Sequence, residues 1–215
     1  MLLALCGLQG AGKDAVACML VERHGFARAT FGAALKDAVA CTFGWDRGLL
    51  EGATPESRAW RESVDPWWAT RLGMPGLTPR RALQLFGTDA VRRHFHPEVW
   101  LAGVERGLDL APHRPTVITD CRFPEEIEMV RRRGGRLVFV SRPPLPGWFH
   151  AYRCGVLGRP PDDVHESEFA WARARFDWVI NNTAGLDQLE AACDAMGDAL
   201  LTCSSRSAAP SSAGP

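Results

Sequence analysis

The sequence predicts an α/β domain with three layers, in which helices cover both faces of a sheet of five mostly parallel strands. Three observations predict it: short apolar runs that suit buried strands, helical patterns between them, and a glycine-rich turn after the first run. The chain has 215 residues, of which 46% are hydrophobic, so it can bury the core of one such domain. A fibre, a repeat array and a mostly disordered chain are excluded.

The first strand, loop and helix are predicted most clearly. Residues 2–6 are apolar and stop at Gly7, which is typical of a strand buried on both faces. Residues 13–24 carry apolar side chains three and four positions apart, and Gly25 follows as a C-cap. We therefore expect a strand, a glycine loop and a helix in this order.

The rest of the chain repeats the alternation of strands and helices. Strands are predicted over 28–31, 116–119, 137–140 and 178–180, and helices over 124–133 and 186–201. This order is typical of right-handed β-α-β units. The domain is expected to span residues 1–203, because residues 204–215 consist largely of serine, alanine and proline and predict a disordered tail.

Two stretches interrupt the alternation. Residues 44–79 contain four tryptophans among several prolines and glycines, too aromatic for a solvated linker. We expect a helical insertion over 44–110 that closes over an acceptor ligand. Residues 142–163 are rich in proline, glycine and arginine and follow a predicted strand, where ligands gather in open α/β sheets, so they predict a mobile lid.

Charge and cysteine content exclude several classes of protein. The 25 basic and 25 acidic residues cancel, so no general positive field exists to bind a nucleic acid stably. The seven cysteines are scattered without a C-x-x-C pair, which indicates neither a disulfide framework nor a zinc site. Residues 1–6 are too short for a signal peptide or a membrane span, so we expect a cytoplasmic protein with no membrane partner.

The turn after the first predicted strand has the spacing of a phosphate-binding loop. Residues 7–13 read G-x-x-x-x-G-K, so that backbone N–H groups and a helix N-terminus would bind phosphate, and Lys13 would reach the outer phosphates of a nucleotide. The alternative is a glycine turn with a surface lysine. Position 14 is Asp where the motif usually has Ser or Thr. We expect Asp14 to hold Mg²⁺ directly or through water, and an aspartate that only stabilises the helix dipole is equally compatible.

Lys36 is the other lysine of a chain that otherwise uses arginine for its cations. It stands just after a predicted strand and near the start of a predicted helix, on the sheet edge that carries the phosphate-binding loop. A lysine in a chain that otherwise uses arginine indicates that the position needs the compact charge of an ammonium group and not the planar guanidinium group of arginine. We expect Lys36 to bind a substrate phosphate, with a surface lysine as the alternative.

A third segment predicts a nucleotide-facing helix. Thr78 is an N-cap followed by Pro79, and Arg80 and Gln84 then share one helix face. Arginine suits a phosphate, the Gln84 amide offers a donor and an acceptor to a base, and Gly87 permits close approach of backbone. A solvated helix face is the equally open alternative.

Polar residues also follow the predicted strand 116–119. Asp120 could orient metal-bound water or contact substrate, and Arg122 stands at the same carboxyl end. Glu126 lies one helical turn further on and could pair with Arg122 or bind a sugar hydroxyl. Trp100 is expected in the core, with a ring flanking a base as a second use.

The predicted lid carries two arginines. Arg153 and Arg159 would neutralise charge on a transferred phosphoryl group. Solvated loop arginines are the equally open alternative.

The chain resembles the deoxynucleoside monophosphate kinases of tailed bacteriophages over roughly residues 2–200. The matching pieces, in order, are Gly7–Asp14, 35–38, Gln84 with 87–89, Phe95 and Trp100, Asp120-x-Arg122 with Glu126, 140–143, His165-x-x-Glu168, and 179–182. The resemblance implies a P-loop NTPase-type kinase fold and transfer of the γ-phosphoryl group of ATP, with Mg²⁺, to a dNMP. The acceptor would be dGMP, dTMP or a modified pyrimidine dNMP, and the location would be the cytoplasm of a host cell.

The resemblance also implies two sets of binding residues. The ATP set is Gly10, Ala11, Gly12, Lys13, Asp14, Ala15, Arg142 and Asn182. The acceptor set is Lys36, Arg58 (or Arg61 in its place), Arg80, Arg81, Gln84, Gly87, Thr88, Trp100, Asp120, Arg122 and Glu126. Two positions depart from the family pattern, because Gln9 stands where a basic residue is expected and Ala15 where a threonine is expected.

The expected mechanism uses Lys13, Arg122, Arg153 and Arg159 to neutralise charge. No general base is assigned, because a phosphate oxygen is already nucleophilic. Dephospho-coenzyme A, phosphomevalonate or a hydroxymethylated base in phage DNA would be alternative acceptors. A nucleotide-gated regulatory protein is an alternative from another class, and the absence of an N-K-x-D string counts against GTP. Small nucleotides are the expected partners, and a homodimer is compatible with the sequence.

Overall fold

The structure is a computed structural model that describes residues 1–206, and the side chains up to residue 200. The chain forms two compact units. The first consists of residues 1–30 and the chain from Ala111 onward, and the second of Phe31–Leu110. The second unit therefore begins thirteen residues before the predicted insertion at 44, because Val39 packs with Leu50 and Leu77 in its core.

The first unit is built on five parallel strands. They are β1 (Leu2–Cys6), β2 (Ala27–Ala29), β3 (Thr116–Ile118), β4 (Arg136–Ser141) and β5 (Trp178–Asn181), in the order β2-β3-β1-β4-β5. Every neighbouring pair is parallel, for example Ala4 with Ile118 and Leu137. This confirms the predicted five-stranded α/β fold and places β1 at the centre of the sheet.

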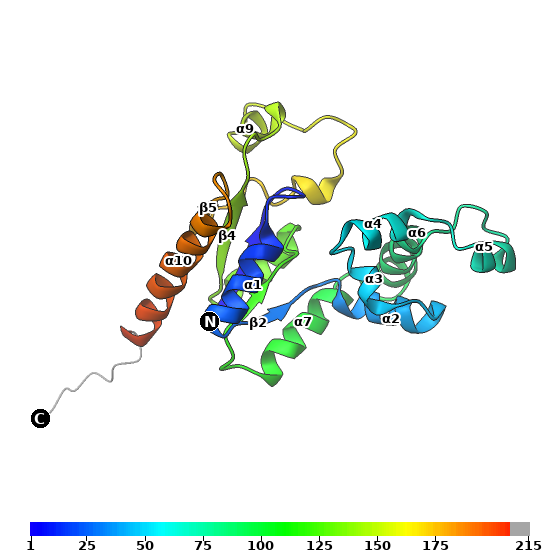
Figure 1. The fold of residues 1–215 in the computed structure, drawn as a ribbon, viewed down its shortest axis with the longest axis horizontal. Coiled ribbons are helices and arrows are strands. Elements are labelled where there is room, and N and C mark those ends of the chain that lie inside the picture. Colours follow the sequence, from blue (N-terminus) through cyan, green and yellow to red (C-terminus); the bar gives the residue numbers. More distant parts are fainter. Residues whose placement is uncertain (207–215) are drawn as a thin grey trace, which may run out of the picture. The chain divides into compact units, whose positions relative to one another are not determined.

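The helices of the first unit that pack against this sheet are α1 (Lys13–His24), α8 (Pro124–Arg132) and α10 (Leu186–Arg206). The unit also contains α9 (Gly147–Arg153), which Figure 1 shows beyond the ends of the strands, and the 3-10 turn η2 (Glu166–Glu168). Leu5 of β1, Leu20 of α1 and Met196 of α10 share one core cluster. Side chains of a strand alternate between the two faces of a sheet, so Leu2 of β1 points to the face opposite Leu5. There Leu2 and Val130 of α8 both lie against Gly135. Among residues 1–206, no helix is both long and apolar enough to cross a membrane.

Part of the predicted lid is packed into the first unit. Helix α9 lies within 142–163, where no helical period was predicted, and its Phe149 is fully buried. The Phe149 ring lies 5.8 Å from that of Phe139 and 5.7 Å from that of Trp171. Mobility of the segment stays a prediction. Residues 204–206 continue α10 and so differ from the predicted tail, whereas residues 207–215 lie outside the described chain.

The second unit is helical. Its elements are α2 (Ala33–Phe43), α3 (Arg47–Glu51), α4 (Pro55–Glu62), α5 (Pro66–Leu72), α6 (Pro79–Gln84), the π-helical segment η1 (Leu85–Arg92) and α7 (Val99–Leu110). Trp45 stacks on Phe43 at 4.4 Å, and Trp68 and Trp60 pack edge-on against this pair. These tryptophans thus serve the core of the unit. Closure of the insertion over a ligand stays a prediction.

Candidate active site

The loop between β1 and α1 has the backbone that the G-x-x-x-x-G-K spacing predicts. Gly12 is the N-cap of α1 with a φ of 100°, and a Cβ there would lie 2.5 Å from the Asn182 side-chain nitrogen. Both the left-handed backbone and the lack of space require glycine at this position. The first helical residue is Lys13, so the amino end of α1 opens directly onto the loop.

The Lys13 side chain folds back over this loop. Its Nζ donates hydrogen bonds to the carbonyl oxygens of Gly7, at 2.7 Å, and of Leu8, at 2.9 Å. Burial lowers the pKa of Lys13 below its ordinary value and the Arg122 guanidinium lowers it further, whereas the Glu168 and Asp14 carboxylates raise it. A phosphate in the loop would favour the charged ammonium. A half-buried ammonium beside the amino end of α1 is the combination expected of an anion site.

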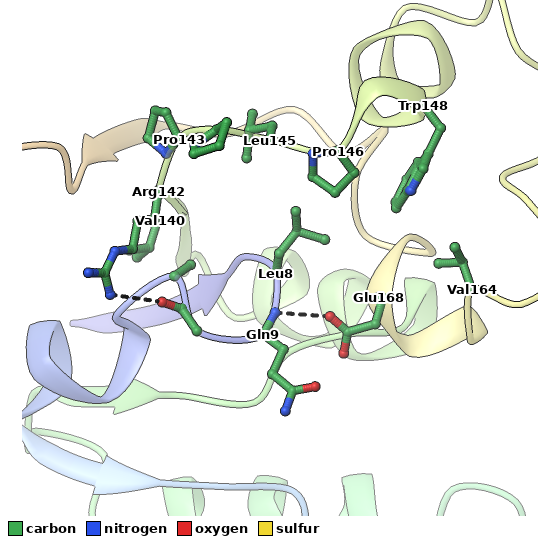
Figure 2. Close-up of a pocket in the computed structure, with 13 residues that line it drawn as sticks. Leu8, Gln9, Val140, Arg142, Pro143, Leu145, Pro146, Trp148, Val164 and Glu168 are labelled. Carbon is green, nitrogen blue, oxygen red and sulfur yellow. Dashed lines mark hydrogen bonds between the residues drawn. The ribbon is translucent and has the colours of Figure 1, made fainter.

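Two predicted ATP-binding residues donate hydrogen bonds to backbone carbonyl oxygens of the loop between β1 and α1. Asn182, just after β5, donates from Nδ2 to the carbonyl oxygen of Ala11 at 3.0 Å. Arg142, just after β4, donates to the carbonyl oxygen of Gly10 at 3.5 Å, as Figure 2 shows. The structure thus brings both residues to the loop.

Arg122 also reaches this site, from the segment after β3. Its Nη1 donates to the Ser167 hydroxyl at 3.2 Å and to Glu168 Oε1 at 3.3 Å. The other oxygen of Glu168 accepts the backbone N–H of Gln9 at 3.0 Å (Figure 2). The sequence placed Glu168 only within a family match and gave it no role, because its partners are distant in the chain.

Glu126, which was expected to pair with Arg122 or to bind a sugar hydroxyl, contacts the backbone at the start of α8, and a sugar contact stays a prediction. Its side chain is buried, and Oε2 accepts the backbone N–H groups of Arg122, at 2.7 Å, and of Phe123, at 3.1 Å. It therefore fixes the amino end of α8 and the backbone of Arg122. Asp120 lies half-buried just after β3.

A cavity of about 450 Å³ opens above the loop. Figure 2 shows the outer face of the loop on one side and the segment after β4 on the other. The lining includes Leu8, Gln9, Arg142, Leu145, Pro146, Trp148, Val164 and Glu168. Apolar walls with one cation and one carboxylate suit a small molecule that has an aromatic part and a charged part.

Asp14, the predicted metal ligand, lies at the edge of the loop. Its side chain is 80% exposed and pairs with Arg28 of β2, which also donates to the Thr119 hydroxyl at 3.4 Å. The carboxylate is a hard oxygen donor, so its chemistry fits Mg²⁺. The Arg28 guanidinium would compete with the metal for it.

The two arginines of the predicted lid differ in placement. The Arg153 guanidinium lies over the rings of Phe139 and Phe176, 5.0 and 5.1 Å from their centroids. Arg159 is 76% exposed, with Asp162 at 3.8 Å. A role of either residue in neutralising a phosphoryl group stays a prediction.

Eight residues of the predicted acceptor set lie in the second unit. Arg80, Arg81 and Gln84 line one cavity of about 430 Å³ together with Glu62 and Asp89, and Arg80 pairs with Glu62 at 3.0 Å. The structure thus gathers three predicted residues at one cavity. The sequence analysis gave neither carboxylate a role: Asp89 stood only within the matched piece 87–89, and Glu62 lies 18 residues before Arg80 in the chain.

The remaining acceptor residues are engaged within the second unit or exposed. Lys36 pairs with Glu51 at 2.6 Å. The Trp100 indole N–H donates to the carbonyl oxygen of Gly87 at 3.2 Å. Gly87 has no side chain, which leaves space for the Leu35 side chain. Arg58 and Thr88 are exposed, and Arg61 donates to the backbone oxygen of Glu51 at 3.4 Å. Contact of these residues with a substrate stays a prediction.

The central strand β1 runs directly into the lysine-bearing loop of an all-parallel sheet, and this arrangement defines a phosphate-loop nucleotide-binding protein. No family model matches the chain. It is 27% identical over 202 residues, covering 87% of this chain and 91% of the relative, to a protein of Acanthamoeba polyphaga mimivirus with the provisional name deoxynucleotide monophosphate kinase. It is also 40% identical over 55 residues to deoxynucleoside-5'-monophosphate kinase of Escherichia phage T5, covering 26% of this chain and 22% of that protein.

Solved structures with similar folds include TT1252 from Thermus thermophilus, with 22% identity, a TM-score of 0.46, and coverage of 93% of this chain and 97% of that one. Dephospho-CoA kinase from Campylobacter jejuni has 11% identity, a TM-score of 0.48, and coverage of 93% and 96%. The sequence relatives confirm the predicted resemblance to the deoxynucleoside monophosphate kinases.

Proposed function

We propose that the protein is a deoxynucleoside monophosphate kinase that transfers the γ-phosphoryl group of ATP to a dNMP and yields a dNDP. The observation that carries the proposal is the Lys13 loop at the end of the central strand, in a chain that is similar to a named kinase over most of its length. ATP would be bound by the first unit. Backbone N–H groups of the loop and the amino end of α1 would hold its phosphates.

The acceptor would use the predicted residues at the cavity of the second unit. Arg80 and Arg81 offer guanidinium groups to its phosphate, and Gln84 offers an amide to its base. Lys36 would bind phosphate after exchanging its contact with Glu51. Which of the four bases is accepted follows from contacts with this cavity.

Transfer would proceed by attack of an acceptor phosphate oxygen on the γ-phosphorus. The bond from this phosphorus to the β,γ-bridging oxygen would break, and ADP would leave. Lys13 and Arg122 would offset the charge of the transferred group, and no general base is required. Asp14 would hold Mg²⁺, which when bound offsets charge on the phosphate oxygens of ATP. The chain's own contribution is to position the two nucleotides and to supply fixed positive charge.

Release of ADP in a coupled assay tests this proposal, with each of the four dNMPs and dephospho-coenzyme A as acceptors. We expect Lys13→Ala to lower kcat about 100-fold or more with an unchanged melting temperature, because one preorganised charge in the site contributes on this scale. Arg106→Ala is the matched control, because it removes a cation from the exposed face of α7, outside the predicted site. This variant should retain activity.

Two results would contradict the proposal. One is ADP release that no dNMP stimulates, which would favour a regulatory nucleotide-binding protein. The other is more than about a tenth of the wild-type rate in Lys13→Ala. Preference for dephospho-coenzyme A over all four dNMPs would retain the kinase class and reject the acceptor.

A further inference from the structure

Glu168 connects three separate segments of the first unit. It lies at the end of η2, and its two carboxylate oxygens have different partners. Oε2 accepts the N–H of Gln9 in the phosphate-binding loop, and Oε1 pairs with the Arg122 guanidinium. The Glu168 side chain is only 24% exposed, so this carboxylate is a fixed part of the site.

The segment that carries Glu168 is itself well held. The ring nitrogen Nδ1 of His165 accepts the backbone N–H of Ser167 at 3.2 Å and caps η2. The Glu168 N–H donates to the carbonyl oxygen of His165 at 2.9 Å. The Ser167 hydroxyl gives Arg122 a second acceptor. The short turn therefore presents two neighbouring oxygen groups to one guanidinium.

Arg122 needs such a partner because it lies within electrostatic range of another cation. It lowers the pKa of Lys13, as expected for two like charges near each other. Glu126 accepts the backbone N–H of Arg122, whereas the Arg122 side chain donates to Ser167 and Glu168. Without an anion, repulsion from Lys13 would favour orientations of Arg122 that point away from the loop.

We propose that Glu168 is a positioning residue for phosphoryl transfer, which ties the phosphate-binding loop to Arg122 and holds that guanidinium on the side where the γ-phosphoryl group reacts. This inference rests on the proposed kinase function. A charge that is already in place when the reaction begins stabilises the transition state without reorganisation. Loss of Glu168 should therefore act on kcat more than on nucleotide binding.

The test uses the full chain with three substitutions in one turn. Glu168→Ala removes both contacts, and Glu168→Gln retains an amide oxygen for the Gln9 N–H but loses the charge opposite Arg122. Glu166→Ala, two residues earlier and exposed, is the matched control. The measurements are kcat, KM for ATP and for the preferred dNMP, the Kd of a fluorescent ATP analogue without acceptor, and the melting temperature.

We expect Glu168→Ala to lower kcat about 10- to 100-fold while the Kd of the analogue changes less than about threefold. Glu168→Gln should recover part of the loss, and Glu166→Ala should match wild type. In an Arg122→Ala background, Glu168→Ala should add no more than about a twofold loss, because the two residues act as one unit.

Three results would overturn the inference: an unchanged kcat in Glu168→Ala, a weaker Kd that accounts for its whole loss, or a full additional loss in the Arg122→Ala background. An inactive wild-type protein with every dNMP would instead reject the proposed function, and this inference with it. An active wild-type protein and a Glu168→Ala variant with the same kcat would reject only the role of Glu168.

Discussion

The charge of Lys13 makes nucleotide binding sensitive to pH. Burial and Arg122 lower its pKa below the ordinary value of 10.5 in the free protein, whereas a bound phosphate favours the ammonium and raises it again. We therefore expect the Kd for ATP to rise as pH increases toward 10.5, before an ordinary lysine would lose its proton. Titration of a fluorescent ATP analogue between pH 7 and 10 measures this.

The lowered pKa of Lys13 also sets the direction of two further effects of pH. Between the lowered pKa and 10.5 the unfolded chain holds more protons at Lys13, so this residue contributes increasing stability to the free protein as pH rises. Glu168→Gln removes a carboxylate that raises the pKa, and should move the loss of ATP affinity to lower pH. A Kd that stays constant up to pH 10 would contradict this account of Lys13.

At the scale of elements, α8 depends on Glu126. Its buried carboxylate satisfies two partly buried backbone N–H groups at the amino end of the helix. Glu126→Ala should lower the free energy of unfolding by about 1–3 kcal/mol, because both donors lose their partner. Glu126→Gln should lose less, since the amide oxygen can still accept. Urea unfolding followed by circular dichroism measures both variants.

A sugar contact of Glu126 would give a different pattern. The KM for dNMP would then rise in Glu126→Gln while the free energy of unfolding stayed at the wild-type value. Glu128→Ala, an exposed residue of the same helix, provides the control for loss of a carboxylate.

The elements that were predicted are those whose signals are local. Helix α1 has its predicted bounds because its start at Gly12 and its end at Gly25 both follow from positive-φ glycines. The π-helical segment η1 was missed, since its residues have no signal that separates them from a continued α-helix, and Gly87 faces Leu35 of another helix. Glu168 was missed as a site residue for a similar reason, because Gln9 lies 159 residues away in the chain.

At the scale of the whole molecule, the formal charge is zero although the predicted site is cationic. Within the first unit, Lys13 and Arg122 have Glu168 nearby, and within the second, Lys36 has Glu51 and Arg80 has Glu62. Each of these four predicted phosphate-binding cations thus has a carboxylate nearby. The positive charge of these residues is therefore balanced locally, and a phosphate that enters the site would compete with carboxylates such as Glu51 and Glu62.

The division into two units predicts separate responses to the two substrates. A ligand stabilises the part of the protein that binds it, by an amount set by its concentration relative to Kd. We expect a non-hydrolysable ATP analogue to slow amide hydrogen exchange at residues 7–16, and a dNMP to slow it at residues 78–92. Some amides exchange only when the unit that binds the ligand opens. At a ligand concentration of about 100 times Kd, their exchange should be slowed about 100-fold.

Mass spectrometry of peptic peptides from the full chain measures this exchange. The deoxynucleoside without its phosphate is the control for the second response. It carries no anion for Arg80 and Arg81 to bind, so it should leave residues 78–92 unprotected. Arg80→Ala should weaken the dNMP response and leave the ATP response unchanged. Protection of residues 7–16 by the dNMP, with none at 78–92, would show that the second unit does not bind the acceptor and that the predicted acceptor residues in this unit are wrong.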